Sequence, residues 1–191
     1  FVGFLIFEFF ATATQTSLTT LKDNSSLLIK SKLPRELFIL SRVLTAFVNF
    51  LLGCIPFAAV LAWYRAAVTI YYFMIPVVLL LLLIFTTGMS YLVSIWFVFQ
   101  RDARNIYSNF IFILRFFVAM FYSVDWVADG VKWVIQHNPL YAYIYVMRQC
   151  VVYGRMPEGM YITQMFAWAI GMFGFGILIF KKYENEVVER L

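Results

Sequence analysis

Apolar residues dominate this chain in long runs that are separated by short polar islands. A run of about twenty apolar residues lets a helix cross a bilayer, because each helical residue rises about 1.5 Å. Four runs reach that length and a fifth is somewhat shorter; they cover residues 2–21, 37–63, 71–99, 161–180 and, for the fifth, 106–122. Because a segment in lipid must satisfy its own backbone hydrogen bonds, the pattern predicts an all-α integral membrane protein with about five spans.

The composition supports this reading. Hydrophobic residues make up 63% of the 191 positions and charged residues only 13%. A soluble domain of this length could not bury so much apolar surface. We therefore expect a single transmembrane domain over residues 1–191, and since Phe1 already lies inside a span, we expect the natural protein to continue upstream of it.

Positive charge gathers in three segments, and we use the net charge of +5 to orient the chain rather than to suggest a nucleic-acid partner. Cytoplasmic loops of membrane proteins are enriched in Lys and Arg. The three segments are the loop between the first two spans, the turn near residue 100 and the tail 181–191. All three are therefore expected on the cytoplasmic side, with the region 123–159 outside.

The island between the first two spans, residues 24–36, is short, basic and amphipathic. Its apolar patch, its basic residues and the turn that follows are formed by Leu27, Leu28, Ile29, Lys30, Lys32, Pro34, Arg35 and Glu36. Pro34 is expected at the first position of the next helix, where its missing N–H costs nothing. Such an island either docks into a protein partner or lies on anionic lipid, and the pattern alone leaves both open.

Two ionisable residues lie inside predicted spans, Glu8 in the first and Arg115 in the fifth. A charge near the bilayer centre is costly, so it normally faces a bundle interior or a water-filled path. Glu8 is then either the counter-ion of Arg115 or an independent polar lining residue. The alternative for both is that they snorkel toward an interface.

Small residues predict where helices approach closely. Gly88 lies midway along 71–99, where it could kink the helix or reduce the side-chain packing around it. Ala167 and Gly171 are four residues apart in the final apolar run. This spacing predicts close helix packing there.

The region 123–159 is rich in aromatic residues, among them Trp126, Trp133, Tyr141 and Tyr145. Its two apolar pieces, on either side of Asn138-Pro139, are each about ten residues long and too short to cross a bilayer. They predict interfacial or re-entrant helices with aromatic rings at headgroup depth.

No nucleotide-hydrolysing or metal-dependent motif is visible in the sequence. The single histidine and the two cysteines lack metal-ligand spacing. Active transport would then need an ion gradient or a separate ATPase. Glu8 is essentially the only acid within the spans, too little for a proton relay, which favours the ATPase.

Three segments in order resemble those of a known family. They are Leu33-Pro34-Arg35-Glu36-Leu37, then Phe99-Gln100-Arg101-Asp102 at the end of a span, then Asn138-Pro139-Leu140 with Arg148 and Gly154 before the last span. With this order and spacing the chain resembles the transmembrane subunit of type 2 ABC exporters, in the branch that moves lipid-linked cell-surface polymers.

The resemblance implies a six-span family fold, of which the first span has no counterpart here, and a permease homodimer in the bacterial cytoplasmic membrane. Two copies of a separate subunit would bind ATP and Mg, so this chain itself would not be an enzyme. Residues 24–33 would be the coupling helix that docks into the ATPase, and 123–159 would form external gate helices.

The cargo implied is an undecaprenyl-diphosphate-linked polymer, such as teichoic acid, O-antigen or capsule. From charge and position we expect either Arg115 or the basic residues on the coupling side to contact the diphosphate. Arg115 is also expected to line the path, together with Glu8, Trp126, Trp133, Tyr141 and Tyr145. Two alternatives stay open: export of a drug or simple lipid, and a membrane scaffold whose basic island only binds lipid.

Overall fold

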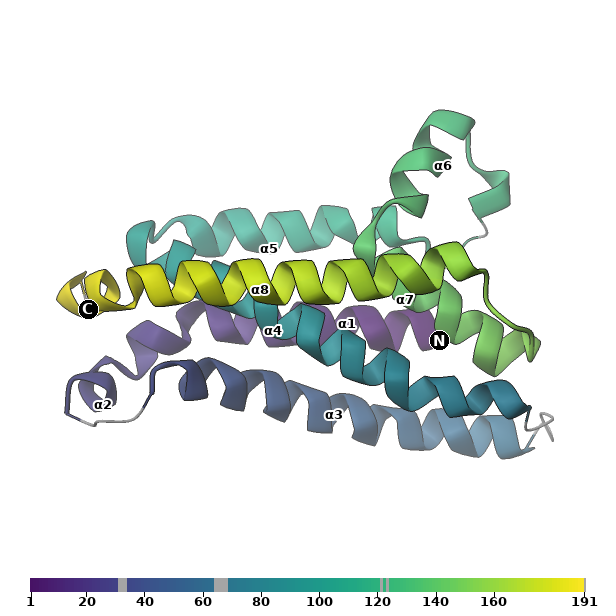
Figure 1. Ribbon diagram of the computed structural model, residues 1–191, viewed down its shortest axis with the longest axis horizontal. Coiled ribbons are helices and arrows are strands. Elements are labelled where there is room, and N and C mark those ends of the chain that lie inside the picture. The colour runs from purple at the N-terminus through teal and green to yellow at the C-terminus, as the bar shows by residue number, and fades with distance from the viewer. Residues whose placement is uncertain (31–33, 64–68, 121, 123, 191) are drawn as a thin grey trace.

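The computed structural model describes residues 1–30, 34–63, 69–120, 122 and 124–190, and all regular structure in these ranges is helical. The five longest helices run side by side along one axis (Figure 1). They are α1 Val2–Asp23, α3 Glu36–Trp63, α4 Ile75–Phe99, α5 Ala103–Leu114 and α8 Gly159–Arg190. The predicted all-α membrane fold is confirmed.

Short elements lie at the two ends of this bundle (Figure 1). At one end, α2 Ser25–Lys30 lies near the C-terminus. At the other end are the 3₁₀ turns η1 Ile70–Met74, η2 Phe116–Val118 and η3 Val124–Trp126, the helices α6 Asp129–Gln136 and α7 Pro139–Arg148, and the π-helical turn η4 Gln149–Tyr153. Two short helices therefore form where the two short apolar pieces were predicted.

Three helical segments among the described residues are long and apolar enough to cross a membrane: Glu36–Trp63, Ile70–Phe99 and Gly159–Val187. Helix α1 has 22 residues, but Glu8 and a run of hydroxyl residues lower its hydropathy. Helix α5 has only 12 residues. The total of five spans stays a prediction.

The fifth predicted span differs most from the structure, because α5 ends at Leu114 rather than continuing to residue 122. The chain continues as one 3₁₀ turn and then places Ala119 in the left-handed region, with φ 48°. Side chains of the α7 region bind the carbonyls exposed there: Asn138 Nδ2 donates to Phe117 O, and Arg148 donates to Ala119 O and Met120 O. These bonds stabilise the turn in place of a continuing helix.

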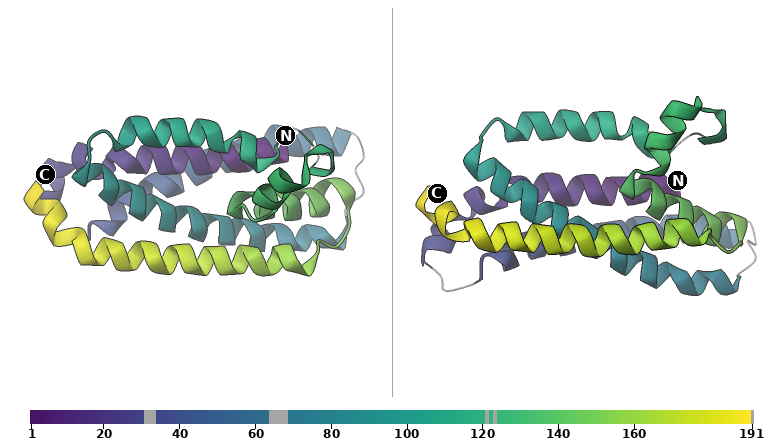
Figure 2. Two further views of the ribbon diagram at one scale, coloured as in Figure 1. Left: turned by 90° about the horizontal axis from the view of Figure 1, so that it is seen from above. Right: turned by 45° about the horizontal axis from the view of Figure 1, so that its top comes forward.

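The core forms around α1, which packs against α3, α4, α5 and α7 (Figure 2). Phenylalanines fill much of this space, including Phe9 against Phe47 and Phe10 against Phe85, with ring centroids 5.5 and 5.7 Å apart. Tyr143 of α7 is fully buried and donates its hydroxyl to Met165 O of α8 at 3.1 Å. Its side chain is therefore part of the core.

Helices α4 and α8 approach most closely at two glycines. A Cβ on Gly88 would lie 2.4 Å from Met172 O, and a Cβ on Gly176 would lie 2.3 Å from Gly88 O. The backbones are therefore in contact there. The prediction for Ala167 and Gly171 was wrong for packing within the chain, because both are exposed and a Cβ on Gly171 would meet nothing within 4 Å.

Candidate functional site

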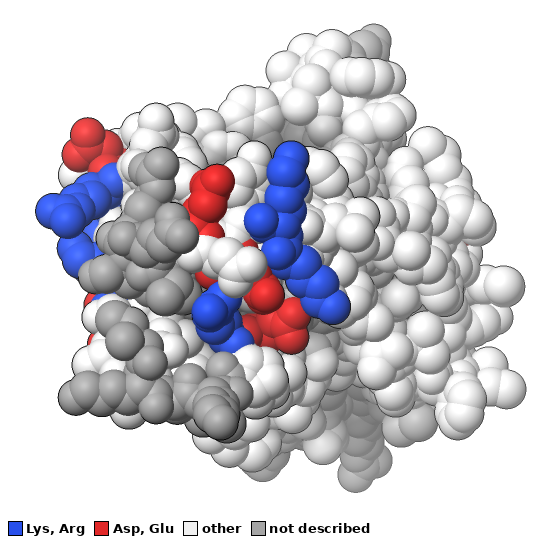
Figure 3. Space-filling view, turned by 60° about the vertical axis from the view of Figure 1, so that its left-hand side comes forward, with Lys and Arg blue, Asp and Glu red and all other residues white. Residues whose placement is uncertain are grey.

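The three basic segments lie at the same end of the bundle, although they are far apart in sequence. This end carries α2, the turn between α4 and α5, and the last turns of α8 (Figure 1). Figure 3 shows basic and acidic side chains gathered there, while most of the remaining visible surface carries no charge. Arg101 and Asp102 are both exposed in the α4–α5 turn. One charged end of this kind is what the predicted orientation requires.

Helix α2 begins directly after α1. The side chain of Asn24 donates to Thr20 O at 2.8 Å, and the Asn24 carbonyl accepts from the amides of Leu27 and Leu28. A helix of six residues is not stable alone, so tertiary contacts must hold it. Leu28 supplies such a contact, because it is only 5% exposed and belongs to a cluster with Leu21, Ile39, Tyr91, Ile95, Phe180 and Val187.

This burial corrects the predicted docking patch. Leu28 cannot enter a partner's groove while it fills its own chain's core. Leu27 is 54% exposed and remains available. The side chains of Ile29 and Lys30, and the whole of Lys32, lie outside the described residues, so their docking roles stay predictions.

The segment that follows α2 is tied to the tail. Arg35 Nη1 donates to Glu184 O at 2.8 Å and to Asn185 Oδ1 at 3.4 Å. Pro34 is exposed and accepts from the Leu37 amide, but α3 begins at Glu36, two residues later than expected for a proline at the first helical position. The half-buried Glu36 opens that helix, where a negative charge favours the positive end of the helix dipole.

Glu8 and Arg115 form an ion pair between α1 and α5. Glu8 Oε1 lies 2.8 Å from Arg115 Nη2, and the guanidinium also stands over the Phe7 ring at 5.4 Å. Of the predicted alternatives, the structure shows the counter-ion. The side chains are 37% and 41% exposed, so the pair lies at the surface of this chain rather than in its core.

At the opposite end, the third motif has a structural role. Asn138 caps α7, accepting from the Leu140 amide at 3.0 Å with Pro139 in the first turn. Arg148 holds the turn after α5 through two carbonyls. Gly154 has φ 58°, and a Cβ there would lie 2.8 Å from Thr69 Oγ1. These residues hold the short elements at this end against the bundle.

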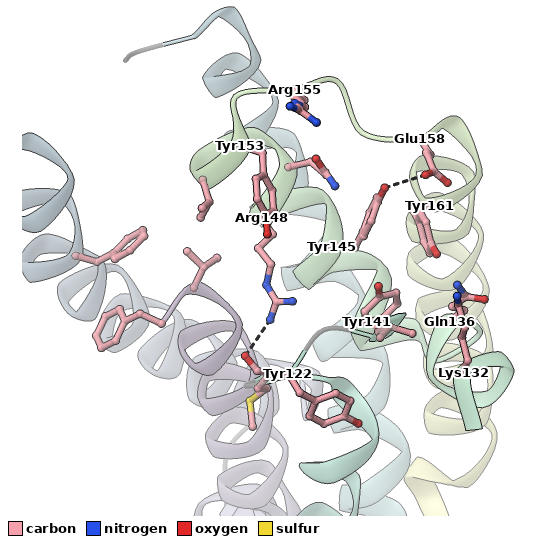
Figure 4. A pocket seen from close by; sticks show the side chains of 17 residues that line it. Tyr122, Lys132, Gln136, Tyr141, Tyr145, Arg148, Tyr153, Arg155, Glu158 and Tyr161 are labelled. Carbon is pink, nitrogen blue, oxygen red and sulfur yellow. Dashed lines mark hydrogen bonds between the residues drawn. The ribbon is translucent and has the colours of Figure 1, made fainter. Parts of the chain in front are cut away.

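Arg148 also lines a cavity of about 740 Å³ at this end of the bundle (Figure 4). Tyr145 and Tyr161 have ring centroids 4.1 Å apart, and Tyr141 lies 5.8 Å from Tyr161. Glu158 Oε1 accepts from the Tyr145 hydroxyl at 3.1 Å. Burial, reinforced by the Glu158 carboxylate, raises the pKa of Tyr145 to about 12.

The predicted aromatic residues divide between the cavity and the surface. Tyr141 and Tyr145 line the cavity, Tyr141 almost completely buried. Trp126 and Trp133 are 88% and 63% exposed and are not among the described residues that line it. Their predicted place on a substrate path therefore has no support in this chain alone. Sequence reasoning missed two residues: Glu158, which immediately precedes α8, and Tyr161, which lies in the first turn of that helix.

Comparison with known proteins agrees with this architecture. The family model described as "ABC-2 type transporter" matches residues 1–152. The chain is similar to two proteins from Klebsiella pneumoniae named O-antigen export system permease protein RfbA, each 25% identical over 190 residues, or 99% of this chain and 73% of the relative. A protein of the same name from Myxococcus xanthus is 25% identical over 194 residues, covering the whole chain and 74% of the relative.

The family match covers most of the chain, including the first two of the three motifs and the whole of the Glu8–Arg115 pair. The chain belongs to the ABC-2 type transporter family, whose members are membrane permeases that work with an ATP-binding subunit.

Proposed function

We propose that this chain is the permease subunit of an ATP-driven exporter that moves a lipid-linked cell-surface polysaccharide across the cytoplasmic membrane. The observation that carries the proposal is the exposed Leu27 on α2, at the end where the basic segments meet. The O-antigen export role printed for the similar proteins supports a polysaccharide cargo. The bound lipid would be undecaprenyl diphosphate.

In this proposal two permease copies and two ATP-binding subunits form the working complex. ATP and Mg bind in the partner subunits. Closure of those subunits moves α2, and the contacts of α2 with α1 and α8, together with the cluster that holds Leu28, pass the motion to the bundle. The movement opens a path between the two permeases for the sugar chain, while the lipid tail stays in the bilayer.

The Glu8–Arg115 pair gives this path a polar contact within the membrane. Glu8 lies about 9 Å along α1 from Val2. Both charged side chains are partly exposed, and contact between their exposed parts and lipid tails would cost free energy. A second permease copy or a polar cargo would relieve that cost. Arg115 Nε is buried and Nη2 binds Glu8, so we assign the N–H donors of Nη1 to the diphosphate of the cargo.

Two measurements test the proposal together. The chain is expressed with the ATPase encoded beside its gene and purified in mild detergent, and an ATPase that copurifies supports the exporter. Depletion of the chain should then cause lipid-linked polymer to accumulate on the cytoplasmic side. Purification without the ATPase would favour the membrane scaffold, and normal surface polymer after depletion would favour a drug or simple lipid as cargo.

A further inference from the structure

We infer that the external cavity is a saccharide-binding subsite, which holds sugar units of the exported chain as they leave the permease. This inference rests on the proposed function and adds a location and a binding mode to it. The cavity lies between α7, η4 and the start of α8, with the beginning of α1 on one side (Figure 4). Its volume of about 740 Å³ falls within the range of about 300–1,000 Å³ that small-molecule sites have.

The cavity has a rigid aromatic wall. Tyr145 is half-buried and presents part of its ring, while Tyr141 and Tyr161 behind it are 6% and 5% exposed. The Tyr145 and Tyr161 rings are close enough to brace each other. A braced aromatic ring loses little side-chain entropy when the apolar C–H face of a pyranose stacks on it.

The polar groups suit the hydroxyls of a sugar. Glu158 binds Tyr145 through Oε1, which fixes the carboxylate and leaves its other oxygen to accept from a ligand hydroxyl. Gln136 and Gln149 lie on the cavity wall and offer both donors and acceptors. An aromatic face beside a fixed carboxylate and amides matches a polyhydroxylated ring better than an acyl chain, which has no hydrogen-bonding group.

The position of the cavity also fits a ligand on its way out. Glu158 immediately precedes α8, and Tyr161 is in its first turn. Helix α8 has 32 residues, so it extends about 48 Å to the charged end where its tail contacts the α2 region. Sugar binding at one end of α8 and ATPase docking at the other would thus act on the same helix.

The test measures sugar binding by the complete permease–ATPase complex in lipid nanodiscs with saturation-transfer NMR. The probe is a short oligosaccharide released by mild acid from the cell's own surface polymer. We expect binding to the unmodified complex, and roughly tenfold weaker binding for Tyr145→Ala, which removes the stacking face. Glu158→Gln keeps the shape of the side chain but replaces the carboxylate by an amide, so it tests hydrogen bonding to the sugar without a change in packing. It should weaken binding severalfold.

Phe73→Ala is the matched control, because it removes an aromatic residue that is 86% exposed at the same end of the bundle and lies outside the cavity lining. Its affinity should equal that of the unmodified complex. Equal losses for Phe73→Ala and Tyr145→Ala would overturn the inference, as would displacement of the probe by glycerol phosphate, which would identify a lipid-headgroup site. A complex that exports polymer but binds no oligosaccharide would also overturn it and leave the proposed function intact.

Discussion

At the residue scale, the most informative contact is the pair formed by Glu8 and Arg115. Glu8 lies in α1, Arg115 directly follows the last residue of α5, and the two are 107 positions apart in sequence. The sequence identified both residues as candidates for a pair, because ionisable residues within membrane spans are few. It could not show that the two side chains are in contact, because that depends on how α1 and α5 pack together.

Glutamine substitutions separate the structural role of this pair from a role in binding cargo. Glu8→Gln and Arg115→Gln should each lower the stability of the protein, and the double variant should recover most of the loss. We expect a coupling energy of about 1 kcal/mol between the two side chains. This value is low for an ion pair because both side chains are more than one-third exposed and solvent screens the charges. Thermal unfolding in nanodiscs measures this energy.

Export by the same variants tests the diphosphate contact. Arg115→Gln should abolish export, and the double variant should remain inactive although its stability is restored. Normal polymer at the surface of cells that carry the double variant would show that Arg115 has only a structural role.

At the element scale, α2 shows both the success and the limit of sequence reasoning. The amphipathic pattern predicted a short helix in this island, and Ser25–Lys30 is helical. The pattern could not distinguish Leu27 from Leu28, because adjacent apolar residues look alike until a neighbouring helix covers one of them. The cover comes from residues as distant as Val187.

Aspartate at these two leucines should have different effects. Leu28→Asp buries a charge in the cluster and should reduce the amount of folded protein strongly. Leu27→Asp changes an exposed residue, so the protein should fold normally while ATP hydrolysis in the complex no longer drives export. The measurements are the yield of monodisperse protein and the ratio of ATP hydrolysed to polymer exported. Equal yields for both variants would contradict the assignment of Leu28 to the core and of Leu27 to the surface.

The end of α8 should position α2. Val187→Asp places a charge beside Leu28, whereas Val187→Ile keeps the apolar contact. We expect the aspartate variant to reduce the amount of folded protein as Leu28→Asp does, because Val187 is only 1% exposed in the same cluster, and the isoleucine variant to behave like the natural protein. The measurement is again the yield of monodisperse protein, and the same yield from the two Val187 variants would contradict this role for the end of α8.

At the scale of the whole molecule, the crossing of α4 and α8 fixes the bundle. Gly88→Ala and Gly176→Ala should each cost at least about 2 kcal/mol, because the added Cβ meets the backbone of the facing helix. Gly171→Ala, in the same helix as Gly176, has open space and should cost almost nothing. Chemical unfolding of the three variants in detergent compares them, and similar losses in all three would contradict the crossing.

The helical membrane architecture follows from the sequence because run length and hydropathy are local properties. The cavity beside α7 could not be predicted in this way, because Tyr145, Glu158 and Tyr161 meet only when the chain turns back between η4 and α8. Likewise, Gly176 gains its role from the facing Gly88 rather than from its own neighbours. Both features depend on contacts between residues that are far apart in sequence, and the local sequence pattern does not predict such contacts.

The central claim is that α2 docks on an ATP-binding subunit, and site-specific photocrosslinking in intact membranes tests it most directly. A photoreactive side chain is placed at Leu27, and a control is placed at Phe73, which is 86% exposed at the opposite end of the bundle. We predict a crosslink from position 27 to the ATP-binding subunit and none from position 73. Adducts from position 27 to lipid alone would contradict the account and favour the membrane scaffold.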